Sequence, residues 1–393
     1  MSQKKNILFV SSWYPNRLNA TLGIFVKRHA QAVALKHNVS ALYVCPDVNA
    51  KNKYDVDVQN EEGILTVRVY YKKVTSNIPL ISNFQKIIRN RKAYSIAYAE
   101  ILKCFGKPDL VHSNMLVGAS LFSLYLKIKY KIPYLVTEHW TGYLPSDGNY
   151  KGFFLKSITK VVANNATFIT PVSIELQNAL QSHGFKKPKY QIVPNVVDVN
   201  LFSPKKSKVE NSKIRVVHVS SLDDRQKNIS GILTVVERIS KWRNDFELII
   251  IGDGEDKLKL EKQVKNSVLL NSIVFFNGKK TGIELVDELN KGSFFILFSN
   301  FETTVTCAAL EAMAVGLPVL ASDLEVSMRH INQDNGLLVE VNNLNDLEKS
   351  FNLMLDNFVK YDSVLIRNYV IKNFGAEKIS VQFNSIYDEI LNV

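Results

Sequence analysis

The residues best suited to chemistry lie around position 302, where a strand-like apolar run gives way to a short polar loop. Glu302, Thr303 and Thr304 form this loop, directly after the apolar run Phe294–Phe298. A carboxylate accepts hydrogen bonds and a hydroxyl donates and accepts them, and at the carboxyl end of a buried strand both face the usual ligand position. This loop is therefore the first candidate site.

A helix is expected directly after the loop. Val305–Val315 is small and apolar at helical spacing, contains Glu311, and leads into Gly316 and a second apolar run. The free N–H groups at the start of such a helix, from Val305, and the positive end of its dipole favour a negatively charged ligand. The pattern predicts a strand, loop, helix, strand unit with an anion site. The alternative is an ordinary βαβ unit in which Glu311 is solvated.

Strand-like apolar runs alternate with helical patterns along the whole chain, which predicts parallel sheets covered by helices on both faces. The expected strands are Ile7–Ser11, Val39–Val44, Leu110–His112, Tyr134–Thr137, Phe168–Pro171, Gln191–Val193, Arg215–Val219, Glu247–Ile251, Ile273–Phe276, Phe294–Phe298, Pro318–Ala321 and Leu337–Val339. Ile64–Tyr70 alternates and is expected as an extra edge strand. A chain of 393 residues exceeds what one core usually serves, so two domains are expected.

Residues 311–319 read EAMAVGLPV. This segment resembles the donor-site signature of retaining glycosyltransferases of family 4. The resemblance implies an α/β fold of GT-B architecture, in which two doubly wound Rossmann-like domains face a central cleft. The family's two glutamates usually stand eight positions apart, whereas Glu302 and Glu311 are nine apart and Thr303 holds the eighth position. Either Glu302 or Thr303 therefore fills the place of the first glutamate.

The domain boundary is expected in the polar, basic stretch Val199–Lys213. It follows the sequence VPNVVD, at residues 193–198, which resembles an interdomain element of the family. We expect an N-terminal acceptor-binding domain at residues 1–205 and a nucleotide-sugar-binding domain at 206–375. The family's architecture implies that a final helix, at 376–393, crosses back to the first domain.

A second candidate loop follows the strand that ends near His218. It resembles the family element that holds the nucleotide diphosphate with one arginine and one lysine. Lys227, followed by Asn228, fits the lysine; the arginine's place falls on Ser221 or Leu222, so Arg225 is expected to supply the second cation. In the alternative interpretation, Arg225 and Lys227 only pair with the two neighbouring aspartates on the surface.

Glycine-containing turns mark two further loops. Gly252 and Gly254 end a strong strand-like run; the pattern alone is weak, but it resembles the Gly-x-Gly of the family's donor domain, near the nucleotide. Gly23, which leads into a helical pattern, resembles the glycine of the family loop that approaches the donor phosphate and the acceptor. It is otherwise a flexible turn.

A histidine lies in the sequence TEHWTGYLP, at residues 137–145, on the acceptor side. His139 follows a strand and is flanked by Trp140 and Tyr143, whose aromatic faces suit stacking on sugar rings. The family often has a histidine here, which implies that His139 hydrogen-bonds the donor sugar or orients the acceptor, with a general-base role second. The alternative is a structural histidine satisfied within the fold.

Positive charge is concentrated in the first half of the chain. The net charge is +12, and residues 1–200 hold 26 Lys and Arg against 11 Asp and Glu. The basic clusters, with the aromatic residues between them, are Lys72, Lys73, Lys86, Arg89, Arg91, Lys92, Lys186, Lys187 and Lys189, with Tyr70, Tyr71, Phe84, Tyr94 and Phe185. We expect them to dock on an anionic membrane surface; the alternative is a solvated basic face. No nucleic-acid module accompanies them, so no nucleic-acid partner is expected.

The compartment expected is the cytoplasm, with the protein peripheral at the inner face of the membrane. No apolar run reaches the length of a membrane span, and the first residues resemble neither a secretory signal nor an anchor. Cys45, Cys104 and Cys307 are odd in number and widely spaced, so neither a disulfide framework nor a zinc site is expected.

The family resemblance implies a retaining, metal-independent hexosyltransferase that uses a nucleotide sugar and a glycan or lipid-linked acceptor to build a surface polysaccharide or lipopolysaccharide. Lys227, Arg225 and the helix N–H groups would stabilise the leaving phosphate, and Glu311 would bind the ribose. No cofactor or metal is expected: Asp223 and Asp224 are adjacent and would point apart. Two alternatives remain: a sugar-nucleotide epimerase of similar architecture, and a non-catalytic module that binds through its basic face.

Overall fold

The computed structural model describes residues 4–73, 79–205, 213–302 and 306–392, and only the backbone of residues 79–84. The chain divides into two compact units, Met1–Val196 with Ala376–Val393, and Val197–Gly375. The division lies inside the VPNVVD segment, earlier than the expected boundary at 205/206. The backbone explains this position, since the N–H of Val193 donates to Pro171 O (3.1 Å) in the first unit and that of Val197 to Phe374 O (2.9 Å) in the second.

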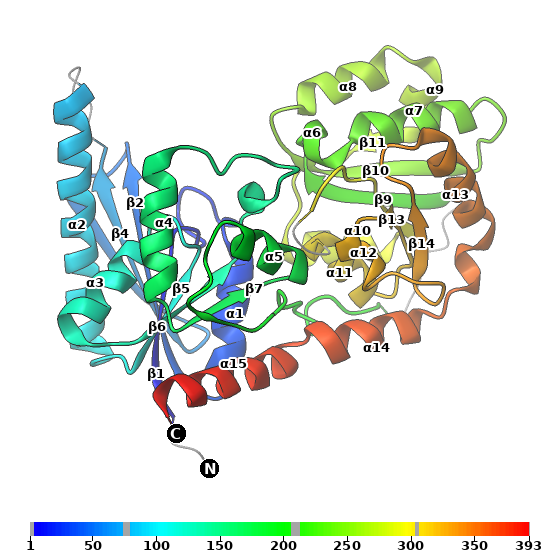
Figure 1. Ribbon diagram of the computed structural model, residues 1–393. Helices are drawn as coiled ribbons and strands as arrows, with labels where there is room; N and C mark the ends of the chain where they lie inside the picture. The colour runs from blue at the N-terminus through cyan, green and yellow to red at the C-terminus, as the bar shows by residue number, and fades with distance from the viewer. Residues whose placement is uncertain (1–3, 74–78, 206–212, 303–305, 393) are drawn as a thin grey trace. The chain divides into compact units, whose positions relative to one another are not determined.

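The first unit holds one sheet and seven helices of the described residues (Figure 1). Its strands are β1 (Asn6–Ser11), β2 (Asn38–Asp47), β3 (Tyr54–Glu61), β4 (Ile64–Lys72), β5 (Leu110–Asn114), β6 (Tyr134–Glu138), β7 (Phe168–Pro171) and β8 (Lys189–Tyr190). Its helices are α1 (Ile24–Ala34), α2 (Pro79–Cys104), α3 (Ser120–Tyr130), α4 (Phe153–Asn165), α5 (Ile174–Ser182), α15 (Ala376–Leu391) and the 3-10 helix η1 (Thr141–Tyr143).

The sheet of the first unit has the order β3-β4-β2-β1-β5-β6-β7-β8. Strand β3 pairs antiparallel with β4, and the other neighbours pair in parallel. Alternate residues of the strands face opposite ways, so one set packs with α2, α3, α4 and α5, and the other with α1 and α15. This explains why the strands read as continuous apolar runs.

The second unit is also a doubly wound sheet. Its strands are β9 (Ile214–Ser221), β10 (Phe246–Asp253), β11 (Val274–Phe276), β12 (Phe294–Leu297), β13 (Val319–Ser322) and β14 (Gly336–Val339). Its helices are α6 (Asp224–Lys227), α7 (Ile229–Ile239), α8 (Lys257–Lys265), α9 (Val268–Ile273), α10 (Gly282–Asn290), α11 (Cys307–Ala314), α12 (Glu325–Met328), α13 (Leu344–Asn357), α14 (Ser363–Phe374) and the 3-10 helix η2 (Phe358–Lys360).

The order of this second sheet is β11-β10-β9-β12-β13-β14, and each pair of neighbours is parallel. Helices α7, α8, α9 and α13 cover one face, and α10, α11 and α14 cover the other. The strand order reverses between β9 and β12, as it does between β1 and β5 in the first unit. Ligands of doubly wound sheets bind outside the carboxyl ends of the strands at such points.

The predicted α/β class with two doubly wound domains is confirmed. Two strand predictions were wrong. Ile64–Tyr70 is not at an edge, because β3 pairs with its outer side, and Gln191–Val193 is irregular while Lys189–Tyr190 forms β8. Across the described residues, no helix combines the length and apolar character that crossing a membrane requires.

Candidate active site

The candidate donor site lies at the carboxyl edge of the second sheet, where β9 and β12 are neighbours. The loop after β9 turns into the short helix α6, which Asp223 caps by accepting from the N–H of Gln226 (3.3 Å). Asn228 then takes the left-handed conformation (φ 47°) that joins α6 to α7. This turn brings Lys227 back toward the end of β12.

Lys227 forms an ion pair with Glu302 from the loop after β12. Each of the two side chains is only 8% exposed. The Glu302 carboxylate also accepts hydrogen bonds from Gln226 Nε2 (3.0 Å) and Ser299 Oγ (2.8 Å). Moving two charges out of water carries a desolvation penalty that can exceed the free energy gained from their attraction. A buried ion pair at this edge of the sheet is therefore better explained by function than by stability.

The two loops are also joined through their backbones. The N–H of Asn300 donates to Gln226 O (2.8 Å), and Asn300 Nδ2 donates to Arg225 O (2.8 Å). The Arg225 guanidinium lies over the ring of Phe301, 5.1 Å from its centroid, in an exposed position. Arg225 therefore belongs to the same cluster as Lys227, and a ligand can reach it.

The remaining predicted residues of this loop lie at its edges. Ser221 is the exposed last residue of β9, and Asn228 Nδ2 donates to Asn342 Oδ1 (3.3 Å). The alternative that Arg225 and Lys227 pair only with the neighbouring aspartates fails for Lys227, whose partner is Glu302. Of these aspartates, Asp224 pairs with Lys259 (3.3 Å).

Gly252 and Gly254 are required by the packing of β10 on the loop after β9. Gly252 has φ 152°, and a Cβ there would stand 2.0 Å from Ser220 O. A Cβ on Gly254 would stand 2.7 Å from the N of Leu222. Close backbone approach therefore explains both glycines without a ligand, and the approach shapes the loop that carries Lys227.

Glu311 is the buried acidic residue of α11, with 6% of its surface exposed. Thr306 begins this helix, and its Oγ accepts from the N–H of Ala309 (3.2 Å). The small residues around Glu311 serve the core: Ala309 and Ala312 are fully buried, in the cluster that packs α11 on α14. The close approach of α14 therefore explains these alanines.

Three predicted site residues, Thr303, Thr304 and Val305, lie outside the described residues. Among the described residues, Glu302 is the member of the predicted polar loop that contacts Lys227. Its partners Gln226 and Ser299 were not predicted, because neither residue type signals a site by itself. The contact that identifies them appears only when the loops after β9 and β12 meet.

Acidic residues of this edge also form one cluster that could hold a cation. Ligand atoms of Asp223, Glu255 and Asp256 lie within 4.8 Å of one another. Asp256 Oδ2 already accepts the N–H of Asp224 (2.8 Å), and exposed acidic groups often gather in this way without a metal. Metal independence therefore stays a prediction.

In the first unit, Gly23 is the residue before α1 and has φ 64°. A Cβ at this position would stand 2.3 Å from Trp13 O. The left-handed backbone and the lack of space both demand glycine. Gly23 thus closes the loop after β1 at the switch point of the first sheet, where the sequence placed it.

His139 follows β6 and is 8% exposed. Its ring lies 4.5 Å from that of Phe25 and 5.6 Å from that of His29, between centroids. Burial, and then the charge of His29, lower the pKa of His139 well below its usual value, against a hydrogen bond that the ring donates to the Asn195 side chain. The imidazole is therefore neutral near pH 7.

A buried carboxylate that was not predicted fixes the loop that carries His139. Glu138 Oε1 accepts the N–H groups of His139 (2.9 Å) and Trp140 (3.0 Å), and its Oε2 accepts that of Leu116 (2.8 Å). Burial raises the pKa of Glu138 to about 6, although these hydrogen bonds lower it. Glu138 therefore joins the ends of β5 and β6.

The stacking surface predicted beside His139 is not formed by Tyr143. This side chain is 1% exposed and packs against Trp140, Tyr150 and Phe185 in the core. Trp140 remains partly exposed. Tyr143 was misassigned because an aromatic residue that follows a strand looks the same in sequence whether it faces solvent or the core.

The predicted basic surface differs from expectation in two ways. The aromatic residues placed in it, Tyr70, Tyr71, Tyr94 and Phe185, are buried, and the side chain of Phe84 lies outside the described residues. The clusters also lie at opposite edges of the sheet, because Lys72 ends β4 and Lys73 follows it at the carboxyl edge, whereas Lys186 and Lys187 precede β8 at the amino edge. They cannot all face one flat surface.

Two doubly wound sheets, each with polar loops at its switch point, define an α/β protein of the GT-B class. Known proteins agree with this class. Residues 23–201 match the family model Glycosyltransferase Family 4, and residues 200–369 match Glycosyl transferases group 1. The protein belongs to the family 4 type of glycosyltransferases.

Individual relatives are similar at moderate identity. An uncharacterized glycosyltransferase of Methanocaldococcus jannaschii is 28% identical over 327 residues, which cover 82% of this chain and 86% of the relative. The MMP alpha-(1->4)-mannosyltransferase of Mycolicibacterium hassiacum is 25% identical over 59% of this chain and 57% of its own. Both are named as sugar transferases, in line with the family assignment.

Solved structures share the fold over nearly the whole chain. A sucrose-phosphate synthase from Thermosynechococcus elongatus has a TM-score of 0.76 at 18% identity, covering 99% of this chain and 100% of its own. Anabaena HepE, solved in complex with UDP and glucose, has a TM-score of 0.71 at 14% identity, covering 98% and 100%. At 18% and 14% identity, the structural similarity establishes the fold alone.

Proposed function

We propose that this glycosyltransferase is a retaining, metal-independent hexosyltransferase that moves a sugar from a nucleoside diphosphate sugar to a glycan or lipid-linked acceptor. The pathway we propose is the synthesis of a surface polysaccharide or lipopolysaccharide. The observation that carries the proposal is the buried Lys227–Glu302 pair at the switch point of the second sheet, in a chain whose family transfers sugars.

The leaving group decides what the site must stabilise. Breaking the bond between the anomeric carbon and the nucleoside diphosphate builds negative charge on the phosphate. The Lys227 ammonium has three donors, so it can contact a phosphate oxygen while one donor stays on Glu302. Arg225, which is exposed beside it, supplies the second cation. Fixed positive charge at this point lowers the activation barrier of the transfer, because the negative charge on the leaving phosphate develops in the transition state.

The two glutamates bind the rest of the donor in this proposal. Glu302, fixed by Gln226 and Ser299, accepts hydrogen bonds from the sugar hydroxyls. Glu311, buried on α11, accepts them from the ribose. The N–H groups at the start of α11 face the diphosphate, and Thr303, Thr304 and Val305 are assigned there from the sequence alone.

His139 is proposed to orient a hydroxyl of the sugar or the acceptor. Because burial keeps its imidazole neutral near pH 7, one ring nitrogen can accept a hydrogen bond. The hydrogen bonds of Glu138 to the loop backbone fix the position of the ring. A general-base role is second, because the same burial lowers the basicity of the ring.

We also place the protein in the cytoplasm, peripheral at an anionic membrane surface. The cluster at the carboxyl edge of the first sheet supports this, since Lys73, Lys86, Arg91 and Lys92 are exposed there. Each basic residue near such a surface contributes on the order of 1 kcal/mol. Acceptors carried by a membrane would then lie within reach of the enzyme.

A donor screen tests the proposal. Purified protein is incubated with UDP-, GDP- and ADP-sugars, starting with UDP-glucose because HepE was solved with UDP and glucose, and release of the nucleoside diphosphate is measured. We expect slow release from one donor without acceptor and faster release with it. The NMR coupling constant of the anomeric proton in the product then tests whether the anomeric configuration is retained. No release from any donor would contradict the proposal, and an altered sugar still bound to nucleotide would indicate the epimerase.

A further inference from the structure

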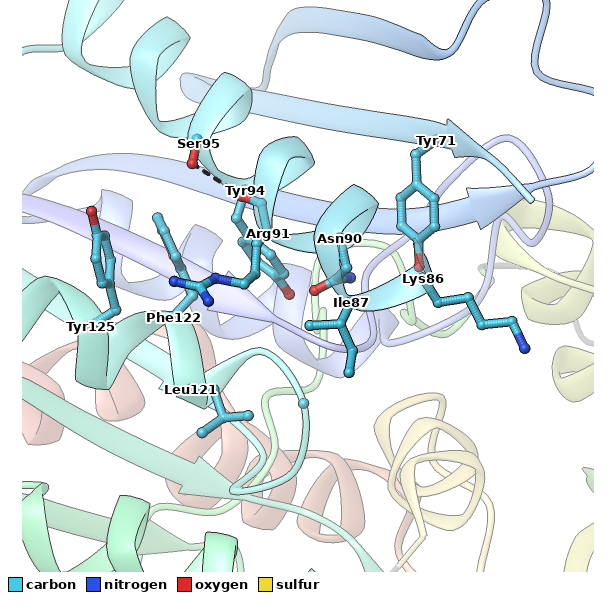
Figure 2. Close-up of a pocket in the computed structure, with 11 residues that line it drawn as sticks. Tyr71, Lys86, Ile87, Asn90, Arg91, Tyr94, Ser95, Leu121, Phe122 and Tyr125 are labelled. Atoms are coloured by element: carbon cyan, nitrogen blue, oxygen red, sulfur yellow. Dashed lines mark hydrogen bonds between the residues drawn. The ribbon is translucent and has the colours of Figure 1, made fainter. Parts of the chain in front are cut away.

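The first unit contains a cavity of about 640 Å³ that is lined by none of the residues predicted for the donor or acceptor site, although four residues of the predicted basic surface line it: Tyr71, Lys86, Arg91 and Tyr94. It lies between the first half of α2 and the start of α3, with Tyr71 from the end of β4 and Gly118 from the loop after β5 (Figure 2). Ser12, which follows β1, holds this loop by accepting the N–H of Ala119 (2.9 Å). The cavity therefore opens at the carboxyl edge of the sheet, where doubly wound folds bind ligands.

One wall of the cavity is a row of stacked aromatic rings. Phe122 stacks on Tyr94 with centroids 4.8 Å apart and on Tyr125 with centroids 5.8 Å apart. Leu121 and Tyr125 of this wall continue along α3 to Ile128, at positions i, i+4 and i+7. These three side chains are 45%, 38% and 64% exposed, so α3 presents an apolar stripe to solvent that begins in the cavity.

The opposite wall is positively charged. Lys86 and Arg91 of α2 line the cavity at separate points, since Figure 2 shows Arg91 extending toward Phe122 and Lys86 extending away from it, and no acidic side chain lines the cavity among the described residues. Residues 72–99 contain no Asp or Glu at all. In Figure 2 the side chains of Ile87, Asn90 and Arg91 extend from α2 toward Leu121 and Phe122 of α3. Arg89 donates to the backbone oxygen of Lys72 and so ties this part of α2 to the end of β4.

We propose that this cavity binds the phosphate-bearing lipid end of the acceptor, with the phosphate at Arg91 and the hydrocarbon chain along Leu121, Tyr125 and Ile128. The inference rests on the proposed function, whose acceptor is either a glycan or a lipid-linked sugar, and selects the second. A free glycan could stack on the aromatic rings but would leave the rest of the exposed apolar stripe, at Leu121 and Ile128, uncovered. Cations beside an apolar groove match an anionic head group joined to an apolar chain.

Binding of farnesyl phosphate to the full chain, without donor, tests the inference. Titration calorimetry compares it with farnesol and with inorganic phosphate, and we expect both to bind at least tenfold more weakly. Arg91→Gln, which removes a charge-assisted contact, should weaken farnesyl phosphate binding about tenfold. The matched control is Lys103→Gln, at the far end of the same helix, where the side chain is 76% exposed.

The apolar stripe has its own pair of variants. Leu121→Ser should weaken farnesyl phosphate binding severalfold, and Leu102→Ser, at an exposed position of α2 outside the cavity, should not. Equal binding of farnesyl phosphate to Arg91→Gln, Leu121→Ser and the unmodified protein would overturn the inference. So would an Arg91→Gln variant that loses binding to phosphatidylglycerol vesicles only, since the residue would then serve a membrane surface. Failure of the donor screen, measured separately, would instead contradict the proposed function.

Discussion

Lys227 and Glu302 show how a site can be recognised from one contact. Each residue was a candidate from sequence, but their pairing was not predicted, because they lie in loops 75 positions apart. The structure joins them since β9 and β12 are neighbours in the sheet. Gln226 and Ser299 also donate hydrogen bonds to the Glu302 carboxylate, and the sequence alone did not predict either of them.

Removing the charge of Lys227 should lower turnover, and it should also lower stability without abolishing folding, because the buried Glu302 carboxylate loses its cation. We expect Lys227→Met to lower nucleoside diphosphate release by roughly 10²–10³-fold, the range seen when one donor to a developing negative charge is lost. Glu311→Gln should lower it by about tenfold or more, through weaker binding of the ribose.

The matched controls are Lys241→Met, at an exposed position after α7, and Glu284→Gln, whose side chain is 70% exposed. Circular dichroism and thermal unfolding verify that each variant folds. Unchanged release in both Lys227→Met and Glu311→Gln would refute the assignment of the site.

At the scale of the elements, the sequence predicted most of the parallel strands because both of their faces are buried. Edge elements were harder. Strand β3 alternates weakly and exposes much of its surface, so it has no apolar run, although the turn Glu62–Gly63, with φ 52° and 82°, is typical of a two-residue hairpin. The misassignment of Tyr143 has a different cause, since its burial depends on partners distant in sequence.

The glycine at the end of β10 should be essential for the second unit. We expect Gly252→Ala to lower the free energy of unfolding by about 3 kcal/mol or more, because the added Cβ would stand 2.0 Å from Ser220 O at φ 152°. Gly278→Ala is the control: its φ is 66° but nothing lies within 4 Å, so only the backbone cost of about 1 kcal/mol applies. Urea unfolding measures both, and equal losses would contradict the packing argument.

At the scale of the whole molecule, the positive charge of residues 1–200 is divided between two edges of one sheet. Only the carboxyl-edge cluster lies at the same edge of this sheet as the loops that carry Gly23 and His139. We expect the double variant Lys73→Gln with Lys92→Gln to weaken binding to phosphatidylglycerol vesicles by about tenfold or more at low salt. The control is Lys186→Gln with Lys187→Gln at the opposite edge.

Vesicle sedimentation at increasing salt measures this binding, which screening should weaken. An equal loss of vesicle binding in the two double variants would contradict the assignment, because it would show that the position of the charge does not matter. Binding that does not respond to salt would argue against electrostatic docking altogether.

Buried histidines should make the fold sensitive to acid. Burial lowers the pKa of His29 and His218 to about 4, and also lowers those of His112 and His139. Their unfolded forms take up protons below about pH 6.5 while the folded forms do not, so stability falls as the pH drops from 6.5 toward 4. Glu138 acts in the opposite sense, because its raised pKa favours the folded state as the pH falls through 6.

The four histidines outweigh the single carboxylate. At pH 5 we expect the free energy of unfolding to be lower than at pH 7 by about 2 kcal/mol for each of His29 and His218, less about 1 kcal/mol regained through Glu138. Urea unfolding at both pH values measures the difference, and titrations at pH 7 and 8 should differ little. Equal stability at pH 5 and 7 would mean that these rings are protonated in the folded state.

The central claim is that Lys227 and its neighbours hold the diphosphate of a sugar nucleotide. A crystal structure with the nucleoside diphosphate released in the donor screen tests it most directly. We predict a phosphate oxygen within hydrogen-bond distance of Lys227 Nζ, with the ribose at Glu311. A diphosphate bound elsewhere, with Lys227 contacting only Glu302, would contradict the account.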